Sequence, residues 1–308
     1  MPHITLPTPC SALGKEASMI DLHLPAADYH ALPAVSASAL RIIHAQTPFH
    51  LWRARQDGVV ETDAMRLGTL IHDAILEPWK PSKAVAIVPD TFTVPADYQP
   101  KSKKDVQPGD VIDWDFKRSH CKAWREDQIA AGRIVMKRSE WEEIRRAAKA
   151  INIHNPEYHA IATSDPEVTV TWETDKGTQC KARIDLLPRD SALGIWDLKT
   201  CTDASPAGFE RAAWAAGYHI QAAWYLDAIR LFDEDRADEF RFIAYEKGSG
   251  AVVIYRASPE FIAAGRRDYA LALEKYEAAV ASGVWPGYAD EVVLDVPKWE
   301  KRKELHGY

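Results

Sequence analysis

Two aspartates decide the interpretation of this chain, and both lie in the stretch KARIDLLPRDSALGIWDLKT, residues 181–200. Asp185 interrupts one apolar run and Asp197 interrupts the next, with the polar residues 188–191 between the two runs. Apolar runs on either side of a short polar loop predict the two strands of a hairpin. Because burying an unpaired carboxylate costs free energy, each aspartate is expected to have a partner.

The hairpin would bring Asp185 and Asp197 together at one edge of a sheet. Two close carboxylates repel each other, and a divalent cation that prefers oxygen ligands, Mg²⁺ or Mn²⁺, relieves the repulsion. Lys199 follows Asp197 by two residues and so shares its side of the strand, where a cation can stabilise charge on a phosphate. The same spacing also fits plain ion pairs between these aspartates and the cations Lys181, Arg183 and Lys199. Spacing alone leaves both interpretations open.

The surrounding pattern predicts an α/β (α+β) fold, a mixed central sheet flanked by helices. EVTVTW, residues 167–172, alternates like a strand, and further strands are expected at 239–246 and 251–256. Helices are expected after Ser36 and over 63–76, 117–132, 139–151, 205–215, 218–232 and 259–281. Ser139 and Glu142 form a capping-box signature, which predicts that the fourth of these helices starts after Ser139.

The 308 residues are expected to form a single domain over 29–308, with its catalytic core at about 160–285. Residues 1–28 are interpreted as an irregular N-terminal segment, and the proline-rich stretch 80–115 as a connection or insertion. No apolar run is long enough to span a bilayer, and the N-terminus lacks the pattern of a secretory signal. The sequence therefore predicts a cytoplasmic protein without a membrane partner.

Charge and cysteine usage narrow the function classes. A net charge of −7 argues against a protein that coats DNA through its whole surface, although basic residues cluster locally at 101–104, 117–125 and 133–138. The four cysteines, Cys10, Cys121, Cys180 and Cys201, form no CxxC pair. Their spacing disfavours a thiolate zinc site and an iron–sulfur cluster.

The chain resembles the PD-(D/E)xK nucleases, and more closely the phage and prophage exonuclease VIII type, the RecE-like double-strand exonucleases. The resemblance extends from about residue 29 to about 280 and rests on segments that occur in order. These are YHALPAVSASALRIIHAQTPFHLW (29–52), RLGTLIHDAILEP (66–78), DPEVTVTW (165–172), CKARIDLL (180–187) and IWDLKTCTDASPAGFERAAWAAGYHIQAAWYLDAI (195–229).

The resemblance implies a set of site residues. Gly68 and His72 match the G-x-x-x-H motif whose histidine is a metal ligand, although taken alone His72 is an ordinary helix histidine. The implied metal ligands are His72, Asp185, Asp197 and the carbonyl of Leu198. The implied catalytic residues are Asp185, Asp197, Lys199, Gln221 and Tyr225, the last two matching a Q-x-x-x-Y motif on one helix face. Glu167 matches an acidic position whose role is open.

The resemblance also implies a function. A Mg²⁺-dependent exodeoxyribonuclease would resect linear double-stranded DNA, 5′ to 3′, for phage-type homologous recombination. The expected partners are double-stranded DNA ends, further copies of the chain in a closed ring, and a single-strand annealing protein of the RecT type. The alternatives are a repair nuclease or endonuclease like RecB and the Cas-associated nucleases, or a non-catalytic DNA-binding subunit on the same fold. The aromatic residues Trp214, Tyr218 and Trp224 belong either to the core or to a surface that stacks on bases.

Overall fold

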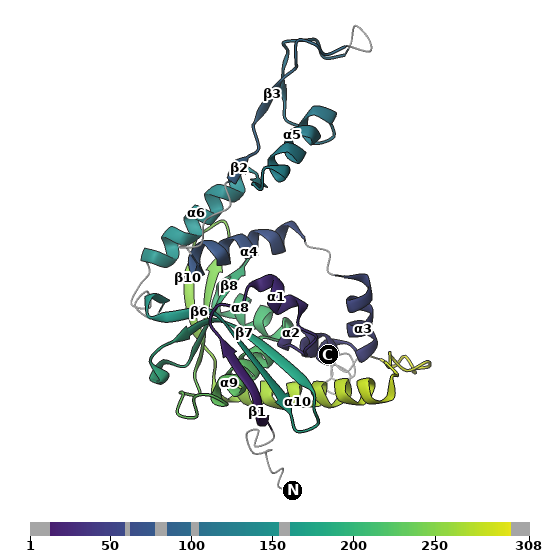
Figure 1. The fold of residues 1–308 in the computed structure, drawn as a ribbon, viewed down its shortest axis with the longest axis vertical. Helices are drawn as coiled ribbons and strands as arrows, with labels where there is room; N and C mark the ends of the chain where they lie inside the picture. Colours follow the sequence, from purple (N-terminus) through teal and green to yellow (C-terminus); the bar gives the residue numbers. More distant parts are fainter. Residues whose placement is uncertain (1–12, 59–61, 78–84, 100–104, 154–160, 297–308) are drawn as a thin grey trace, which may run out of the picture.

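The computed structural model describes residues 13–58, 62–77, 85–99, 105–153 and 161–296. A six-stranded sheet forms the centre of the body, with strand order β1-β6-β7-β8-β9-β10 (Figure 1). Neighbouring strands are antiparallel except for β8 and β9, which are parallel. The strands are β1 (Leu13–Asp21), β6 (Ser164–Thr174), β7 (Gln179–Pro188), β8 (Ile195–Cys201), β9 (Phe240–Glu246) and β10 (Val252–Arg256).

The hairpin predicted around the two aspartates is present as β7 and β8. The two strands pair antiparallel through Leu186 and Trp196, and a short 3₁₀ turn, Ser191–Leu193, joins them. Ile195, Trp196 and Leu198 of β8 are fully buried, as expected for a central strand covered on both faces. The mixed sheet flanked by helices confirms the predicted fold class.

Helices cover both faces of the sheet. The helices of the described residues are α1 (Ala26–Ala31), α2 (Ala37–Ala45), α3 (Pro48–Asp57), α4 (Asp63–Leu76), α5 (Ser119–Ala130), α6 (Arg138–Ile153), α8 (Pro206–Ala215), α9 (Tyr218–Arg230) and α10 (Pro259–Ser282), and α5 lies apart from the sheet, in the arm described below. None of the helices in the described residues is long and apolar enough to cross a membrane. A capping hydroxyl starts several of them: Ser36 accepts from Ala39 N–H, Thr62 from Met65 N–H and Ser258 from Phe261 N–H.

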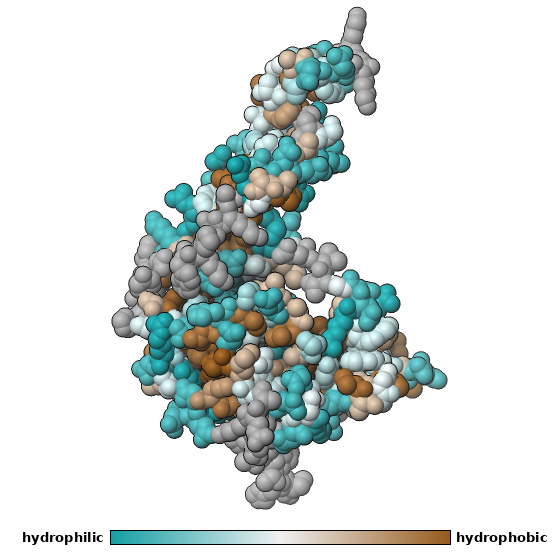
Figure 2. Space-filling view, viewed as in Figure 1, coloured by the Kyte–Doolittle hydropathy of each residue, from teal (hydrophilic) through white to brown (hydrophobic). Residues whose placement is uncertain are grey.

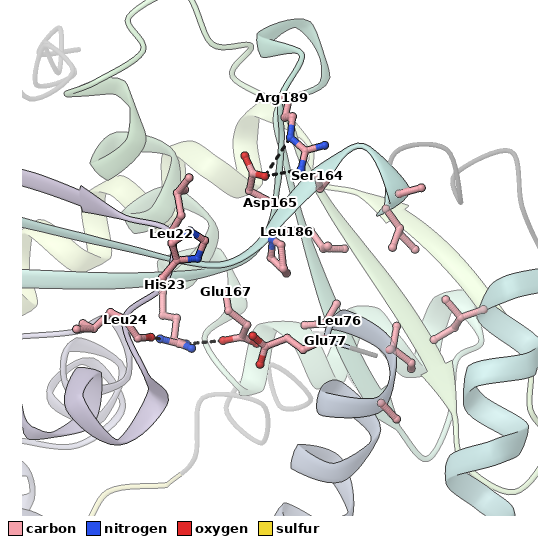
Figure 3. Close-up of a pocket in the computed structure, with 17 residues that line it drawn as sticks. Leu22, His23, Leu24, Leu76, Glu77, Ser164, Asp165, Glu167, Leu186 and Arg189 are labelled. Carbon is pink, nitrogen blue, oxygen red and sulfur yellow. Dashed lines mark hydrogen bonds and ion pairs between the residues drawn. The ribbon is translucent and has the colours of Figure 1, made fainter. Parts of the chain in front are cut away.

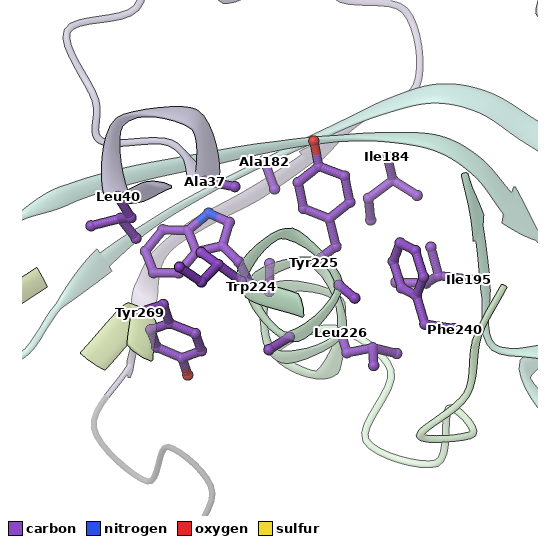
Figure 4. Packing of buried hydrophobic residues seen from close by; sticks show 14 of the residues in the cluster. Ala37, Leu40, Ala182, Ile184, Ile195, Trp224, Tyr225, Leu226, Phe240 and Tyr269 are labelled. Atoms are coloured by element: carbon purple, nitrogen blue, oxygen red, sulfur yellow. The ribbon is translucent and has the colours of Figure 1, made fainter. Parts of the chain in front are cut away.

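Two apolar clusters hold the layers together. The larger one packs α2, α8, α9 and α10 against the sheet, and Trp224, Tyr225 and Leu226 of α9 are among its buried side chains (Figure 4). The smaller one packs α4 and α6 against Leu186 of β7 and other residues of the sheet. The helices α4 and α9 therefore approach the hairpin from two separate clusters, and the functional side chains they carry meet there.

Residues 85–99 and 105–136 form an arm that projects away from the body (Figure 1). Two small sheets build it: β2 (Val85–Ile87) pairs parallel with β5 (Ile134–Met136), and β3 (Thr91–Thr93) pairs antiparallel with β4 (Val111–Asp113). Aromatic side chains pack edge to face inside it, with Trp114 against Phe92, Phe116 and Trp124. Figure 2 shows that hydrophilic residues dominate the arm, whereas apolar atoms gather on the body.

Two sequence predictions about elements are wrong. Residues 13–21 of the segment expected to be irregular form strand β1, which pairs with β6 across a register shift between Gly14 and Met19; residues 1–12 lie outside the described part. The helix expected to start after Ser139 begins at Arg138. Its first turn is capped by Glu140, whose carboxylate accepts the backbone N–H of Lys137 at 2.6 Å.

Candidate active site

Asp185 and Asp197 converge where β7 and β8 lie side by side. The carboxylate of Asp185 accepts the backbone N–H of Leu198 at 2.9 Å, which ties it to the neighbouring strand. Asp197 is fully buried. Burial raises the pKa of Asp185 to about 6, and burial together with the charge of Asp185 raises the pKa of Asp197 to about 6. The two carboxylates are thus close enough to oppose each other's ionisation.

Lys199 lies on the same side of β8 as Asp197 and forms an ion pair with it. Its ammonium group also lies 4.9 Å from the centre of the Tyr218 ring, within the range of a cation–π contact. Burial lowers the pKa of Lys199, but the charges of Asp197 and Asp185 outweigh burial, so the net shift is upward. The raised pKa keeps the ammonium group of Lys199 protonated near pH 7, where it faces the two carboxyl groups.

His72 reaches the pair from α4. Its Nδ1 lies 3.6 Å from Oδ2 of Asp185, and the ring hydrogen-bonds to the backbone of Leu198. Burial, and next the charge of Lys199, lower the pKa of His72 to about 4. The imidazole is consequently neutral near pH 7, the state in which it binds metals. Gly68 lies one turn earlier, where an added Cβ would be 3.5 Å from the hydroxyl of Thr200, so α4 approaches the end of β8 closely at this turn.

Glu167 completes the acidic group and is the residue whose role the sequence left open. It stands opposite Asp185 in the antiparallel register, between the pairs Pro166–Leu186 and Val168–Ile184. Like charges directly opposite each other destabilise a sheet. Arg183 offsets this repulsion through an ion pair with Glu167 while it donates to the carbonyl of Leu24 at 2.9 Å.

The backbone of Glu167 is strained. Its φ is 54°, and it is the one non-glycine residue with positive φ in the described parts of the chain. Such a conformation costs on the order of 1–3 kcal/mol and persists where the surroundings enforce it, which is common at functional sites. Burial raises the pKa of its carboxyl despite the Arg183 hydrogen bond. The strain, the burial and the position beside Asp185 together mark Glu167 as part of the site.

Gln221 and Tyr225 approach the pair from α9, whereas His72 approaches it from α4. The amide of Gln221 donates to Oδ1 of Asp197 at 2.7 Å, so it holds the buried carboxylate in place. Gln221 also hydrogen-bonds to Tyr225, whose hydroxyl pKa lies well above its usual value because of burial and the nearby charges. In the structure, Gln221 therefore contacts Asp197 directly, whereas Tyr225 contacts Gln221.

The donor atoms fit a divalent cation. One atom each from His72, Glu167 and Asp185 lie within 4.8 Å of one another, and two carboxylates with one neutral imidazole suit a divalent metal. The ligand set implied by the sequence contained Asp197 and the carbonyl of Leu198 in place of Glu167. In the structure, Lys199 and Gln221 already contact Asp197, so its charge is shared between the lysine and any cation held next to Asp185.

A cavity of about 690 Å³ opens beside Glu167, between β6, β7 and the end of α4 (Figure 3). Its walls combine the apolar side chains Leu76 and Leu186 with charged ones, among them Glu77, whose carboxylate lies next to that of Glu167. Arg189 borders it and is held by Asp165 at 2.6 Å. The acidic group is therefore reached from a cavity with both polar and apolar walls.

The other residues singled out in the sequence lie outside the group of carboxylates, and most of them contact other parts of the protein. Trp224 is buried and donates to the carbonyl of Lys181 at 3.0 Å, Tyr218 packs under Lys199, and Trp214 is 52% exposed. Lys181, considered above as an ion-pair partner for the aspartates, donates instead to the carbonyls of Tyr29 and Leu32. Cys121, Cys180 and Cys201 are free thiols in the structure; Cys10 lies outside the described residues.

Arg183 was considered from the sequence as an ion-pair partner of the two aspartates, whereas in the structure it pairs with Glu167. The contact of Tyr218 with Lys199 was missed. Arg183 lies two residues before Asp185, on the side of the strand that faces Glu167, and this spacing was the available signal. Nothing in the sequence indicates that Tyr218 meets Lys199, because that contact depends on how α9 packs against β8.

Comparisons with known proteins identify the fold. Residues 36–294 match the family described as "PDDEXK-like domain of unknown function (DUF3799)". A crystal structure of a protein described as a "putative exonuclease" from Eubacterium rectale has a similar fold, with a TM-score of 0.57 at 12% identity. The alignment covers 92% of this chain and 98% of that one. No curated protein matches the sequence. Because the family match spans most of the chain, the chain belongs to this PDDEXK-like family.

Proposed function

We propose that this protein is a Mg²⁺-dependent exodeoxyribonuclease that degrades linear double-stranded DNA from its ends, 5′ to 3′, in phage-type homologous recombination, with Mn²⁺ able to replace Mg²⁺. The observation that carries the proposal is the convergence of His72, Asp185, Asp197 and Lys199 at one point of a PDDEXK-like fold. A non-catalytic relative has no need of this complete set. The preference for ends and the polarity rest on the resemblance to RecE-like exonucleases.

The reaction would be the hydrolysis of a phosphodiester. A water oxygen forms a bond to phosphorus, the bond from phosphorus to the leaving sugar oxygen breaks, and that oxygen takes up a proton. A divalent cation held by His72, Asp185 and Glu167 or Asp197 would polarise the phosphate and lower the pKa of the attacking water. The protein has no need of a covalent intermediate for this chemistry.

Three side chains of the protein would have separate roles in this reaction. Lys199 lies next to Asp197, so its ammonium can offset negative charge that grows on the phosphate in the transition state. Gln221 fixes one oxygen of Asp197 and leaves the other to Lys199. His72 stays neutral because of its low pKa and so keeps a lone pair for the cation.

The proposal is tested by digesting an end-labelled linear duplex beside a covalently closed circle of the same sequence in Mg²⁺. Labels on the 5′ or the 3′ end report polarity. We expect loss of the linear substrate alone, with the 5′ label released first. Cleavage of the closed circle at a comparable rate would establish the endonuclease alternative instead. Binding without cleavage of either substrate would establish the non-catalytic alternative.

Resection leaves a single strand that must be annealed, so we also propose a RecT-type annealing protein as a partner. This follows from the exonuclease assignment and from the resemblance. Co-purification of the two proteins and a gain in recombination when both are present are the expected results. If each protein supports recombination to the same extent without the other, the partnership is wrong.

A further inference from the structure

A second group of metal-binding side chains lies where α2, α9 and α10 meet. It consists of His44 of α2, His219 of α9 and Asp268 of α10, whose donor atoms lie within 4.8 Å of one another. His219 and Asp268 are buried, whereas the side chain of His44 is 38% exposed. The three helices pack against one another through α10 and α9, α10 and α2, and α2 and α9. The group is therefore held by well-packed elements and is open to solvent on the His44 side.

This group is separate from the active site. His219 precedes Gln221 by two residues on α9, and residues two apart on a helix do not face the same way. Gln221 contacts Asp197, whereas Nε2 of His219 contacts Oδ2 of Asp268 at 3.2 Å. The proposed function uses none of the three residues.

The distances match the shell of a small transition-metal ion. Tetrahedral ligands at about 2.0–2.1 Å from Zn²⁺ are about 3.3 Å from one another. Nε2 of His219 and Oδ2 of Asp268 are 3.2 Å apart, and Nε2 of His44 is 3.9 Å from the same Oδ2. A small movement of the exposed His44 ring would complete the three-ligand set, and solvent would supply the fourth position.

The chemistry of the group favours zinc over magnesium. Two imidazole nitrogens and one carboxylate oxygen suit zinc and similar transition metals, whereas Mg²⁺ prefers oxygen ligands throughout. Trp214 stacks on the His219 ring at 4.4 Å between centres, which fixes the ring plane.

A simpler interpretation is that His219 and Asp268 form only a buried hydrogen bond. That contact assigns no role to His44, whose Nε2 lies 3.9 Å from the same carboxylate oxygen that His219 contacts. Arg267 also pairs with Asp268, at 2.9 Å to Oδ1 and 3.2 Å to Oδ2. Because its closer contact is to Oδ1, Oδ2 can serve a metal while the guanidinium stays in place.

We propose that His44, His219 and Asp268 form a second metal site, selective for Zn²⁺, which ties α9 to α2 and α10. An ion there would stabilise the helix that carries Gln221 and Tyr225 into the active site. The site would thus be structural and independent of Mg²⁺ at the catalytic carboxylates.

The test measures zinc binding by calorimetry in the Asp185→Asn, Asp197→Asn double variant, which removes competing carboxylates from the active site. We expect one Zn²⁺ per chain, retained in excess Mg²⁺. Adding His44→Ala should weaken the affinity by more than about 100-fold, since even residues outside the ligand shell change metal affinity 10–100-fold. His30→Ala, which removes another exposed histidine, is the matched control and should leave the affinity unchanged.

Asp268→Asn gives a second ligand variant, and Co²⁺ absorption gives a second readout. We expect the visible bands of Co²⁺ bound to nitrogen and oxygen ligands in the double variant, and their loss with His44→Ala or Asp268→Asn. The proposal is overturned if the double variant binds no stoichiometric zinc. It is equally overturned if His44→Ala weakens binding no more than His30→Ala does.

Discussion

Lys199 can have one of two roles. It either takes part in catalysis or only neutralises the charge of the neighbouring carboxylates. Its ion pair with Asp197 would relieve repulsion in the metal-free site under either interpretation. A catalytic role adds an interaction that is stronger in the transition state than in the ground state. The two interpretations therefore differ in turnover at saturating metal and agree on binding.

Lys199→Ala should lower the single-turnover rate by about 10²–10³, the usual effect of losing one electrostatic contact to the transition state. DNA affinity, measured in Ca²⁺ to suppress cleavage, should change little. Cleavage should be followed across a Mg²⁺ titration. Recovery of wild-type turnover in excess Mg²⁺ would show that Lys199 only balances charge.

The raised pKa values of Asp185 and Asp197 predict how stability depends on pH when metal is removed. Both carboxyls have a pKa of about 6 in the folded protein, against about 3.9 in an unfolded chain. A group with a raised folded pKa stabilises the fold fully below its unfolded pKa and loses that contribution as pH rises through the folded value. The metal-free protein should therefore lose stability as the pH rises from about 4 to about 6–7, the window set by the unfolded and folded pKa values.

We expect this loss to be on the order of 1–3 kcal/mol, since one unit of pKa corresponds to about 1.4 kcal/mol and the two sites are not independent. Urea denaturation at pH 5 and pH 7.5 in EDTA measures it. Asp197→Asn is the matched control and should show a smaller difference between the two pH values. Mg²⁺ at pH 7.5 should restore stability to the wild type. Equal pH dependence in both proteins would contradict the prediction.

At the scale of elements, the sequence predicted the hairpin and the helices next to it. It did not predict strand β1 or the residue at which α6 begins. The bounds of α4 match the predicted helix at 63–76 because Thr62 supplies a cap and the apolar stripe has helical spacing. Strand β1 was missed because LGKEASMID has no strand-like alternation and is fixed by pairing with β6. The first turn of α6 was misplaced because Glu140 caps it from one turn inside the helix.

The sequence predicted which residues form the candidate site, but it did not predict all of the contacts between them. The motif residues His72, Asp185, Asp197 and Lys199 meet as the resemblance implied. The hydrogen bond from Gln221 to Asp197 depends on the packing of α9, which sequence spacing cannot give. The involvement of Glu167 depends on a backbone conformation that is rare for a residue other than glycine.

Strand β6 offers a test of whether Glu167 is strained for a function. Glu167→Gly removes both the carboxylate and the cost of a positive φ, whereas Glu167→Ala removes only the carboxylate. The glycine variant should be more stable than the alanine variant by about 1 kcal/mol. Both should bind the catalytic metal more weakly than the wild type. Denaturation and Mg²⁺ titration measure these effects, and unchanged metal affinity in both variants would exclude Glu167 from the site.

At the scale of the whole molecule, a net charge of −7 is unusual for a protein proposed to hold DNA while it moves along it. The arm carries exposed basic residues on and near α5, among them Lys117, Lys122, Arg125 and Arg133. Acidic residues such as Glu126 and Asp127 stand beside them, so the arm alone is not a strongly basic surface. A closed oligomer around DNA would give processivity without such a surface.

We therefore predict a ring-forming homo-oligomer. Light scattering at micromolar concentration should give a mass that is a whole multiple, greater than one, of the 34.5 kDa chain. Processivity should be measured on the same sample by following a long end-labelled duplex after dilution into competitor DNA. A monomer that digests processively would refute the ring.

Asp185 and Asp197 are proposed to hold the metal ion that the cleavage of DNA requires. The most direct test is single-turnover cleavage of a linear duplex in Mg²⁺ by the wild type, Asp185→Asn and Asp197→Asn, with circular dichroism as a check of folding. Asparagine keeps the size of each side chain and removes its charge. The account predicts cleavage by the wild type that EDTA abolishes, and a rate reduced by at least about 10³-fold in each folded variant. Cleavage by either folded variant at a rate within a few-fold of the wild type would contradict it.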